Sequence, residues 1–194
     1  MSAPVTYLPG FVGSPDFAWL LYRDLHASLP WTRAGNTPRM ECYFNDAPVP
    51  YAYGVGAGRR TYLPEPTWHP AVMVMRRRLE AILQLAGPLD VCFCNLYADQ
   101  REQLGWHADD SPEMDDARPV VTVSLGVARQ IWLRPSTQPT DPSTIERITL
   151  EPGSALVMHP GMQDAWEHRI PKHDRPCGPR ISLTFRGYVA AGAA

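Results

Sequence analysis

Three side chains of this chain could together bind one metal ion. His107 and Asp109 stand one residue apart, and His168 follows much later in the sequence. Successive side chains of an extended segment alternate between its faces, so His107 and Asp109 project to the same side. Two histidines and one carboxylate on one face of a metal ion leave open positions opposite, an arrangement typical of non-haem Fe(II) sites. The pair alone is weak evidence, because a His-x-Asp pair also occurs by chance in solvated acidic loops.

A second charged group lies on a strand predicted near the C-terminus. Residues 180–186, Arg-Ile-Ser-Leu-Thr-Phe-Arg, alternate strictly, which gives one apolar face and one polar face with Arg180, Ser182, Thr184 and Arg186. Two arginines on a solvated strand face would need no function. Guanidinium groups, however, bind carboxylates through paired hydrogen bonds and keep their charge, so they could hold a small dicarboxylate that also chelates the metal. Together the two groups favour a metal site beside a dicarboxylate pocket.

The elements that must position these groups differ between the two halves of the chain. Ser14-Pro15 predicts the start of one helix, and an apolar stripe predicts a second helix over about 70–86 that Gly87-Pro88 ends. Short strands are predicted afterwards, at 91–97, 120–127, 130–133, 147–150, 155–158, 166–170 and 180–189. Helices followed by many short strands indicate a mainly β fold with flanking helices, a double-stranded β-helix or jelly roll whose open mouth holds the metal.

Length and composition indicate one domain. A chain of 194 residues with 44% hydrophobic content can bury a substantial core, so we expect a single domain over 1–194. Within it, about 1–90 would hold the helices and about 91–190 the jelly-roll core. The stretch from Pro30 to His69 is rich in glycine, proline and aromatic residues, which suits a loop-and-hairpin lid or an irregular surface layer.

Charge and cysteine content say little about partners. The net charge of −2 gives no overall basic field for nucleic acid, and Arg76-Arg77-Arg78 is more simply explained as a solvated helix face. Cys92 and Cys94 lack the two-residue spacer of a redox or zinc pair, so buried free thiols are expected. The chain carries no apolar run of membrane-spanning length and no signal-like start, so we expect a cytoplasmic monomer without membrane contact.

Several short stretches match a known family in order and spacing. They are Asn-Leu-Tyr at 95–97, Trp-His-Ala-Asp-Asp at 106–110, Ser-Leu-Gly at 124–126, Trp-Glu-His-Arg-Ile-Pro at 166–171 and Pro-Arg-Ile-Ser-Leu-Thr-Phe-Arg at 179–186. They resemble the AlkB family of Fe(II)/2-oxoglutarate-dependent nucleic-acid dioxygenases. Pro38-Arg39 and Tyr-Ala-Tyr-Gly at 51–54 resemble the segment with which that family covers the substrate base. The resemblance spans most of the chain and implies Fe(II), 2-oxoglutarate and O2.

The resemblance also implies a role for each matching residue. The iron ligands would be His107, Asp109 and His168. The contacts to 2-oxoglutarate would come from Asn95, Tyr97, Ser182, Thr184, Arg180 at its distal carboxylate, and Arg186 near the carboxylate that chelates iron. The family usually has asparagine where this chain has Ser182, which puts one cosubstrate hydrogen bond in doubt. The substrate contacts would be Arg39, Tyr51 at the backbone, Tyr53 stacked on the flipped base, and Asp110 at the base edge.

The implied reaction is oxidative demethylation of N-alkylated bases such as 1-methyladenine and 3-methylcytosine, as in DNA repair. Such a base must be unpaired or flipped, and the Asp110 carboxylate would favour bases that methylation makes cationic. The segment between Trp31 and Pro38 offers no apolar finger to plug a duplex, so we expect alkylated single-stranded DNA as the substrate. The alternatives are a demethylase of tRNA or other RNA, or a non-redox zinc-binding jelly roll, which would leave the two arginines without a role.

Overall fold

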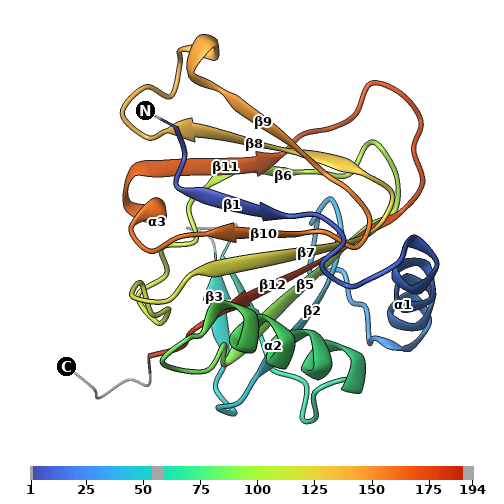
Figure 1. The fold of residues 1–194 in the computed structure, drawn as a ribbon. Helices are drawn as coiled ribbons and strands as arrows, with labels where there is room; N and C mark the ends of the chain where they lie inside the picture. The colour runs from blue at the N-terminus through green and yellow to red at the C-terminus, as the bar shows by residue number, and fades with distance from the viewer. Residues whose placement is uncertain (1, 54–58, 190–194) are drawn as a thin grey trace.

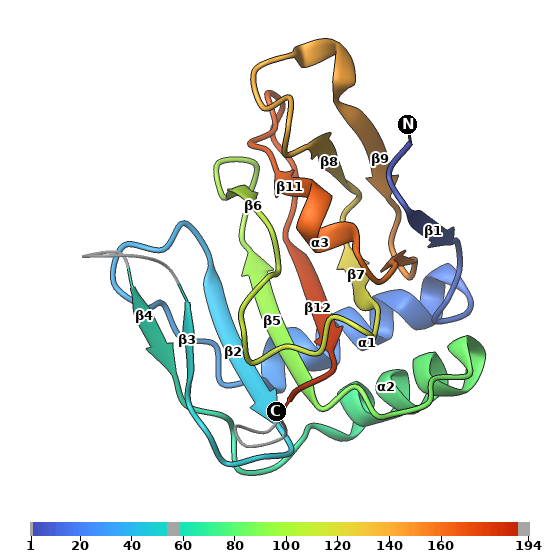
Figure 2. The same ribbon diagram turned by 90° about the vertical axis from the view of Figure 1, so that its left-hand side faces the viewer.

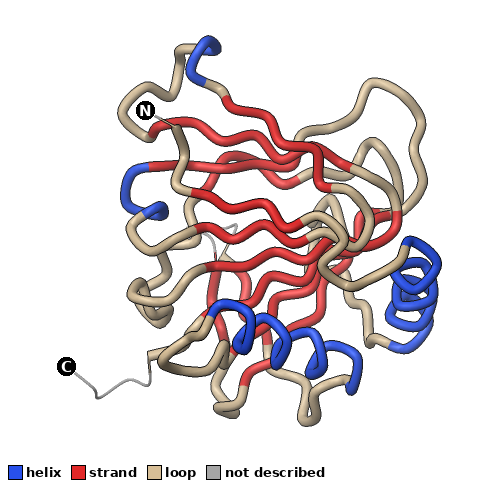
Figure 3. The backbone as a smooth tube through the Cα atoms, in the orientation of Figure 1, coloured by secondary structure: helices blue, strands red, loops and turns tan. Residues whose placement is uncertain are grey.

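Two antiparallel sheets form the centre of the computed structural model, which describes residues 2–53 and 59–189 (Figures 1 and 3). The larger sheet has the order β1 (Val5–Leu8), β10 (Ala155–Met158), β7 (Val120–Gly126), β12 (Arg180–Arg186), β5 (Val91–Tyr97) and β2 (Met40–Asn45). The smaller has the order β6 (Leu104–His107), β11 (Trp166–Ile170), β8 (Arg129–Pro135) and β9 (Glu146–Leu150). A separate hairpin pairs β3 (Tyr51–Tyr53) with β4 (Arg60–Tyr62). This mainly β architecture with flanking helices confirms the predicted jelly roll.

The helices begin at the predicted residues. In α1 (Pro15–Ser28), the Ser14 hydroxyl accepts a hydrogen bond from the amide of Phe17, and α2 (Pro70–Leu83) follows a His69 cap. The predicted end of α2 at residue 86 is wrong by three positions, because Gln84 already adopts a left-handed conformation at φ 50°. A short α3 (Met162–Ala165) precedes β11, and none of the described helices is long and apolar enough to span a membrane.

The larger sheet carries the main hydrophobic core on its outer face. Leu25 of α1 and Leu79 of α2 are fully buried against apolar side chains such as Leu183 of β12. Figure 2 shows both helices on this side of the sheet, with the β3–β4 hairpin beyond the β2 edge. Because strand residues alternate, the opposite face of β5 and β12 is left for polar side chains, and this is the face that meets the smaller sheet.

The outer face of the smaller sheet is built differently. Guanidinium groups alternate with indole rings across it: Arg169 stacks 4.8 Å from the Trp106 ring and 4.2 Å from the Trp132 ring. The Arg134 guanidinium lies 4.1 Å from the centre of the Trp106 ring, and the Arg147 guanidinium lies 4.6 Å from the centre of the Trp132 ring. These cation–π contacts shield the sheet from solvent. Since Trp106 and Arg169 point outward, their chain neighbours His107 and His168 point inward.

Candidate active site

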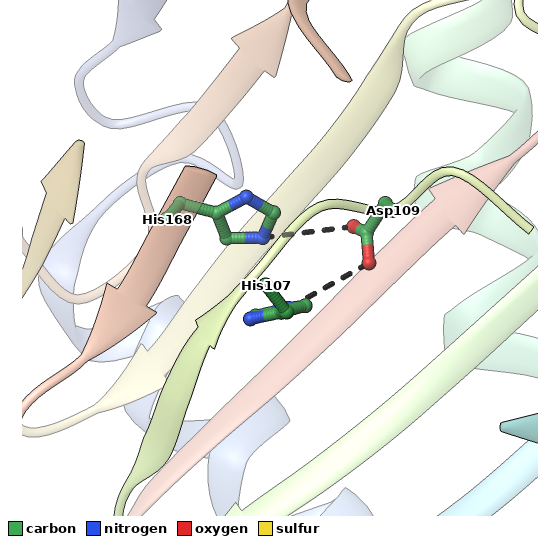
Figure 4. A group of neighbouring side chains, drawn as sticks. All are labelled: His107, Asp109 and His168. Atoms are coloured by element: carbon green, nitrogen blue, oxygen red, sulfur yellow. Dashed lines mark ion pairs between the residues drawn. The ribbon is translucent and has the colours of Figure 1, made fainter. Parts of the chain in front are cut away.

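Two neighbouring strands and one loop bring the predicted metal ligands together (Figure 4). His107 ends β6 and lies directly opposite His168 of β11 in the strand register, with the ring centroids 4.2 Å apart. Asp109 follows in the loop after β6, and each imidazole Nε2 is 3.7 Å from one of its carboxylate oxygens. The three donor atoms all lie within 4.8 Å of one another, which is close enough to share one ion.

The protonation states of these side chains suit a metal site. Burial lowers the pKa of His168 to about 3 and also lowers the pKa of His107, so both imidazoles are neutral at neutral pH. The Nδ1 of His107 lies 2.9 Å from the Gly105 carbonyl oxygen, which can only accept, so Nδ1 carries the proton and Nε2 offers its lone pair toward Asp109. Burial alone would raise the pKa of Asp109, but the Arg186 guanidinium, whose Nη2 lies 2.6 Å from a carboxylate oxygen, holds it below its usual value.

A cavity of about 550 Å³, counted with its open mouth, adjoins the three side chains. It lies between the inner faces of the two sheets, where Ser182 of β12 is directly opposite Asn95 of β5. Its walls hold most of the residues that the sequence predicted for the site: Arg39, Tyr51, Asn95, Tyr97, His107, Asp109, His168, Ser182, Thr184 and Arg186. Two further predicted residues, Arg180 and Asp110, are not among its walls.

Arg180 lies fully buried at the start of β12. Its side chain is 0% exposed, its Nη2 donates to the Ser124 hydroxyl at 2.8 Å, and its guanidinium lies 5.4 Å from the Tyr97 ring. Burial lowers its pKa to about 10. Within the described part of the chain, Nε and Nη1 have no hydrogen-bond partner and no carboxylate forms an ion pair with this group. A buried cation without a counter-ion is costly, so the site fits an anionic ligand such as the distal carboxylate of a dicarboxylic acid.

The chain matches a known family of oxygenases over most of its length. Residues 4–186 match the model of the 2OG-Fe(II) oxygenase superfamily. The chain belongs to this superfamily. Membership implies Fe(II), 2-oxoglutarate and O2, and the donor set of two neutral imidazoles, one carboxylate and a buried guanidinium fits the first two.

Relatives of this oxygenase carry the AlkB name, which confirms the resemblance seen in the sequence. The alpha-ketoglutarate-dependent dioxygenase alkB homolog 3 of Homo sapiens is 31% identical over 195 residues, covering 94% of this chain and 65% of the relative. The DNA oxidative demethylase ALKBH2 of Mus musculus is 29% identical over 156 residues, covering 78% and 62%. The chain therefore spans somewhat less than two thirds of these relatives. The solved structure of OsALKBH1 superimposes with a TM-score of 0.60 at 17% identity, covering 96% of this chain and 99% of that one, and supports the fold.

The structure places the predicted substrate residues of this oxygenase in different surroundings. Arg39 is buried, and its Nε donates to the Asn95 side-chain oxygen. Tyr51 is buried as well, stacks on Tyr43 with ring centroids 5.6 Å apart and shares a 2.9 Å hydrogen bond with the Ser111 hydroxyl. Asp110 is exposed and follows Asp109 directly in the loop after β6. The side chain of Tyr53 and the hairpin tip at 54–58 lie outside the described residues, so the predicted stacking on a base stays a prediction.

Sequence reasoning missed several residues that support the site. The Gln163 side-chain oxygen accepts a 2.8 Å hydrogen bond from the Asp109 amide and so helps to hold the loop after β6 that carries Asp109. Ser124 belongs to a stretch that matched the family, yet nothing in the sequence indicated its bond to Arg180. Glu41 and Tyr62 lie in the region predicted only as loop and hairpin. The strands that carry them, β2 and β4, were not predicted, because a buried polar residue interrupts the alternation of apolar and polar residues that indicates a strand.

Proposed function

We propose that this chain catalyses the Fe(II)- and 2-oxoglutarate-dependent oxidative demethylation of N-alkylated bases in nucleic acid, such as 1-methyladenine and 3-methylcytosine. The observation that carries the proposal is the meeting of His107, Asp109 and His168 beside a cavity with a buried cation next to it. The printed names of the relatives, a dioxygenase and a DNA oxidative demethylase, support the same reaction class.

In this proposal the three clustered side chains bind the iron. Arg180 pairs with the distal carboxylate of 2-oxoglutarate, and Arg186 holds the Asp109 carboxylate in place through their 2.6 Å ion pair. The other cosubstrate contacts come from Asn95, Tyr97, Ser182 and Thr184. When bound, iron and 2-oxoglutarate supply the oxidation: one oxygen atom of O2 enters succinate as CO2 leaves, and the other enters the methyl group, which departs as formaldehyde.

The remaining walls of the cavity act on the base. An alkylated base must leave its stack to reach the site, which costs a few kcal/mol. Tyr51 and Phe93 line the cavity, and Tyr62 packs against Phe93 with the two rings edge to face at 4.9 Å. Contacts between a base and an aromatic ring return about 1–3 kcal/mol per base. The exposed Asp110 carboxylate favours a base that methylation has made cationic.

We further propose alkylated single-stranded DNA as the substrate, a role in DNA repair, a monomeric state and a cytoplasmic location. The DNA name of the ALKBH2 relatives favours DNA over the RNA alternative. The segment from Thr32 to Pro38, just before β2, exposes no large apolar side chain that could replace a flipped base in a duplex, which favours a single strand.

The test is a product screen. The purified chain is incubated with Fe(II), ascorbate, 2-oxoglutarate and one methylated oligonucleotide, made in parallel as DNA and RNA, and loss of the methyl group is followed by mass. Methyl loss that requires 2-oxoglutarate and disappears in Asp109→Ala is expected, while Asp141→Ala in the exposed loop after β8 keeps full activity. Full activity of Asp109→Ala would show that the ligand assignment is wrong.

A spectrum separates this oxygenase from a zinc-binding jelly roll. Anaerobic addition of Fe(II) and 2-oxoglutarate should produce a weak visible charge-transfer band, because the cosubstrate chelates the metal. A zinc protein produces none, since Zn²⁺ has a filled d shell.

A further inference from the structure

Glu41 is a buried carboxylate next to the candidate site that no motif indicated. It lies on β2, directly opposite Asn95 of β5 in the register, and its side chain is 0% exposed. A carboxylate removed from water in this way is costly unless partners compensate for it. Glu41 has two partners: Arg39, which lines the cavity, and Tyr62 of the β3–β4 hairpin.

The first partner is Arg39, which links Glu41 to the cosubstrate side. Its Nη2 forms a 2.7 Å ion pair with Glu41, while its Nε donates to the side-chain oxygen of Asn95. An arginine can only donate hydrogen bonds, so the Asn95 amide must present its oxygen to Arg39 and keep its NH2 for another acceptor. Asn95 lines the cavity, and the oxygens of a carboxylate are acceptors only.

The second partner is Tyr62, which links Glu41 to the hairpin. The Tyr62 hydroxyl donates to the other Glu41 carboxylate oxygen at 2.8 Å. Burial and the nearby Glu41 raise the pKa of Tyr62, so the hydroxyl keeps its proton and remains a donor. Tyr62 pairs with Tyr51 across the hairpin, and Tyr51 lines the cavity. One carboxylate therefore joins the strand that carries Asn95 to the hairpin beside the substrate cavity.

We propose that Glu41 is a positioning residue with two arms: through Arg39 it orients the Asn95 amide toward 2-oxoglutarate, and through Tyr62 it holds the β3–β4 hairpin against the cavity. This proposal rests on the proposed function, because it assigns 2-oxoglutarate and a base to the two sides of the cavity. Each arm predicts a different measurable defect.

The Arg39 arm is tested with Glu41→Gln, which keeps the shape and removes the charge. Binding of 2-oxoglutarate is measured by calorimetry with Mn(II) in place of iron, so no nucleic acid is needed. We expect the Kd of 2-oxoglutarate to rise about tenfold, because the Arg39 guanidinium that holds the Asn95 amide loses its charged partner. The matched control is Glu80→Gln, which removes a carboxylate that pairs with Arg76 on α2, away from the cavity, and should leave this Kd unchanged.

The hairpin arm is tested with Tyr62→Phe, which removes only the hydroxyl. We expect the KM for a methylated oligonucleotide to rise severalfold, while the Kd of 2-oxoglutarate stays at the wild-type value. A merely structural role would lower the melting temperature of both variants without separating the two constants. Wild-type affinity for 2-oxoglutarate in Glu41→Gln, or the same profile in both variants, overturns the proposal. Failure of the wild-type chain to bind 2-oxoglutarate with Mn(II) would instead refute the proposed function.

Discussion

The three candidate ligands are held in the protonation states that metal binding requires. Burial keeps His107 and His168 neutral, and Arg186 keeps Asp109 ionised. Where the ligand side chains are still protonated, metal binding displaces their protons into solution. Here the protons are already absent before the metal binds, because burial lowers the pKa of both histidines and the ion pair with Arg186 lowers the pKa of Asp109.

Metal binding should therefore release almost no protons. We expect calorimetric titration of the chain with Mn(II) at pH 7, in buffers that differ in protonation enthalpy, to give the same binding enthalpy in each. Release of about one proton or more per metal ion would show that an imidazole is charged before the metal binds. In His168→Asn the metal affinity should drop steeply, which confirms that the titration reports on this site.

Ser182 stands where the family usually has asparagine, so the effect of this difference on cosubstrate binding can be tested. It is buried on the cavity wall, opposite both Asn95 and Ser124 in the strand register. An asparagine there would add an amide donor within a cavity that has room for it. We expect Ser182→Asn to lower the KM for 2-oxoglutarate severalfold, by about the value of one hydrogen bond, with kcat unchanged. A higher KM would mean that the larger side chain overpacks the wall, and Ser182→Ala serves as the control for the lost hydroxyl.

At the scale of elements, the turn from β7 controls where Arg180 lies. β7 ends at Gly126 with φ +90°, and a Cβ at this position would collide with the Pro179 carbonyl oxygen and lie 3.2 Å from the Arg180 Cα. Arg180 begins β12, so a displaced turn would move the buried guanidinium.

Gly126→Ala should therefore damage both folding and cosubstrate binding. We expect the free energy of unfolding in urea to fall by more than about 2 kcal/mol, together with weaker 2-oxoglutarate binding. Gly35→Ala is the matched control, because Gly35 has φ +56° but nothing within 4 Å of a built Cβ. That substitution should cost only about 1 kcal/mol, from backbone strain alone, and leave binding unchanged. Equal losses in the two variants would contradict a role for the close approach.

The sequence predicted the elements whose two faces have simple environments. β5, β10 and β11 have the predicted bounds, since continuous or alternating apolar residues mark them. β2 was missed, because the carboxylate of Glu41 on its inner face is buried, and neither its ion pair with Arg39 nor its hydrogen bond with Tyr62 shows in a local hydrophobic pattern. The early end of α2 at Gln84 also lacked a signal, since a non-glycine residue rarely adopts the left-handed conformation. Local pattern reveals burial in apolar surroundings, but it does not reveal which polar groups will meet.

At the scale of the whole molecule, the buried histidines connect the site to stability. The folded-state pKa of His168 is about 3, below its usual value of about 6.5, so the unfolded chain binds more protons between these two pH values. The free energy of unfolding of the metal-free chain should therefore rise with pH across this window and fall as the pH drops. Urea unfolding at pH 4.5 and pH 7 should show a loss at the lower pH on the order of 1–3 kcal/mol, and His168→Asn should reduce this difference. An equal difference in the variant would mean that other groups carry the pH dependence.

The last property of the whole molecule is its choice between single and double strands. A duplex demands that the protein replace the flipped base and offset a few kcal/mol of lost stacking. The segment from Thr32 to Pro38 exposes Thr32, Arg33, Gly35, Asn36 and Pro38, which include no large apolar side chain to fill the gap. A net charge of −2 supplies no general attraction to phosphate that would offset the cost.

We therefore expect kcat/KM for 3-methylcytosine to be about tenfold or more higher in a single strand than in the matched duplex. A duplex with the lesion opposite a mismatched base should fall between them, because its unpairing costs less. Comparable turnover of the single strand and the matched duplex would mean that some other part of the chain fills the vacated stack.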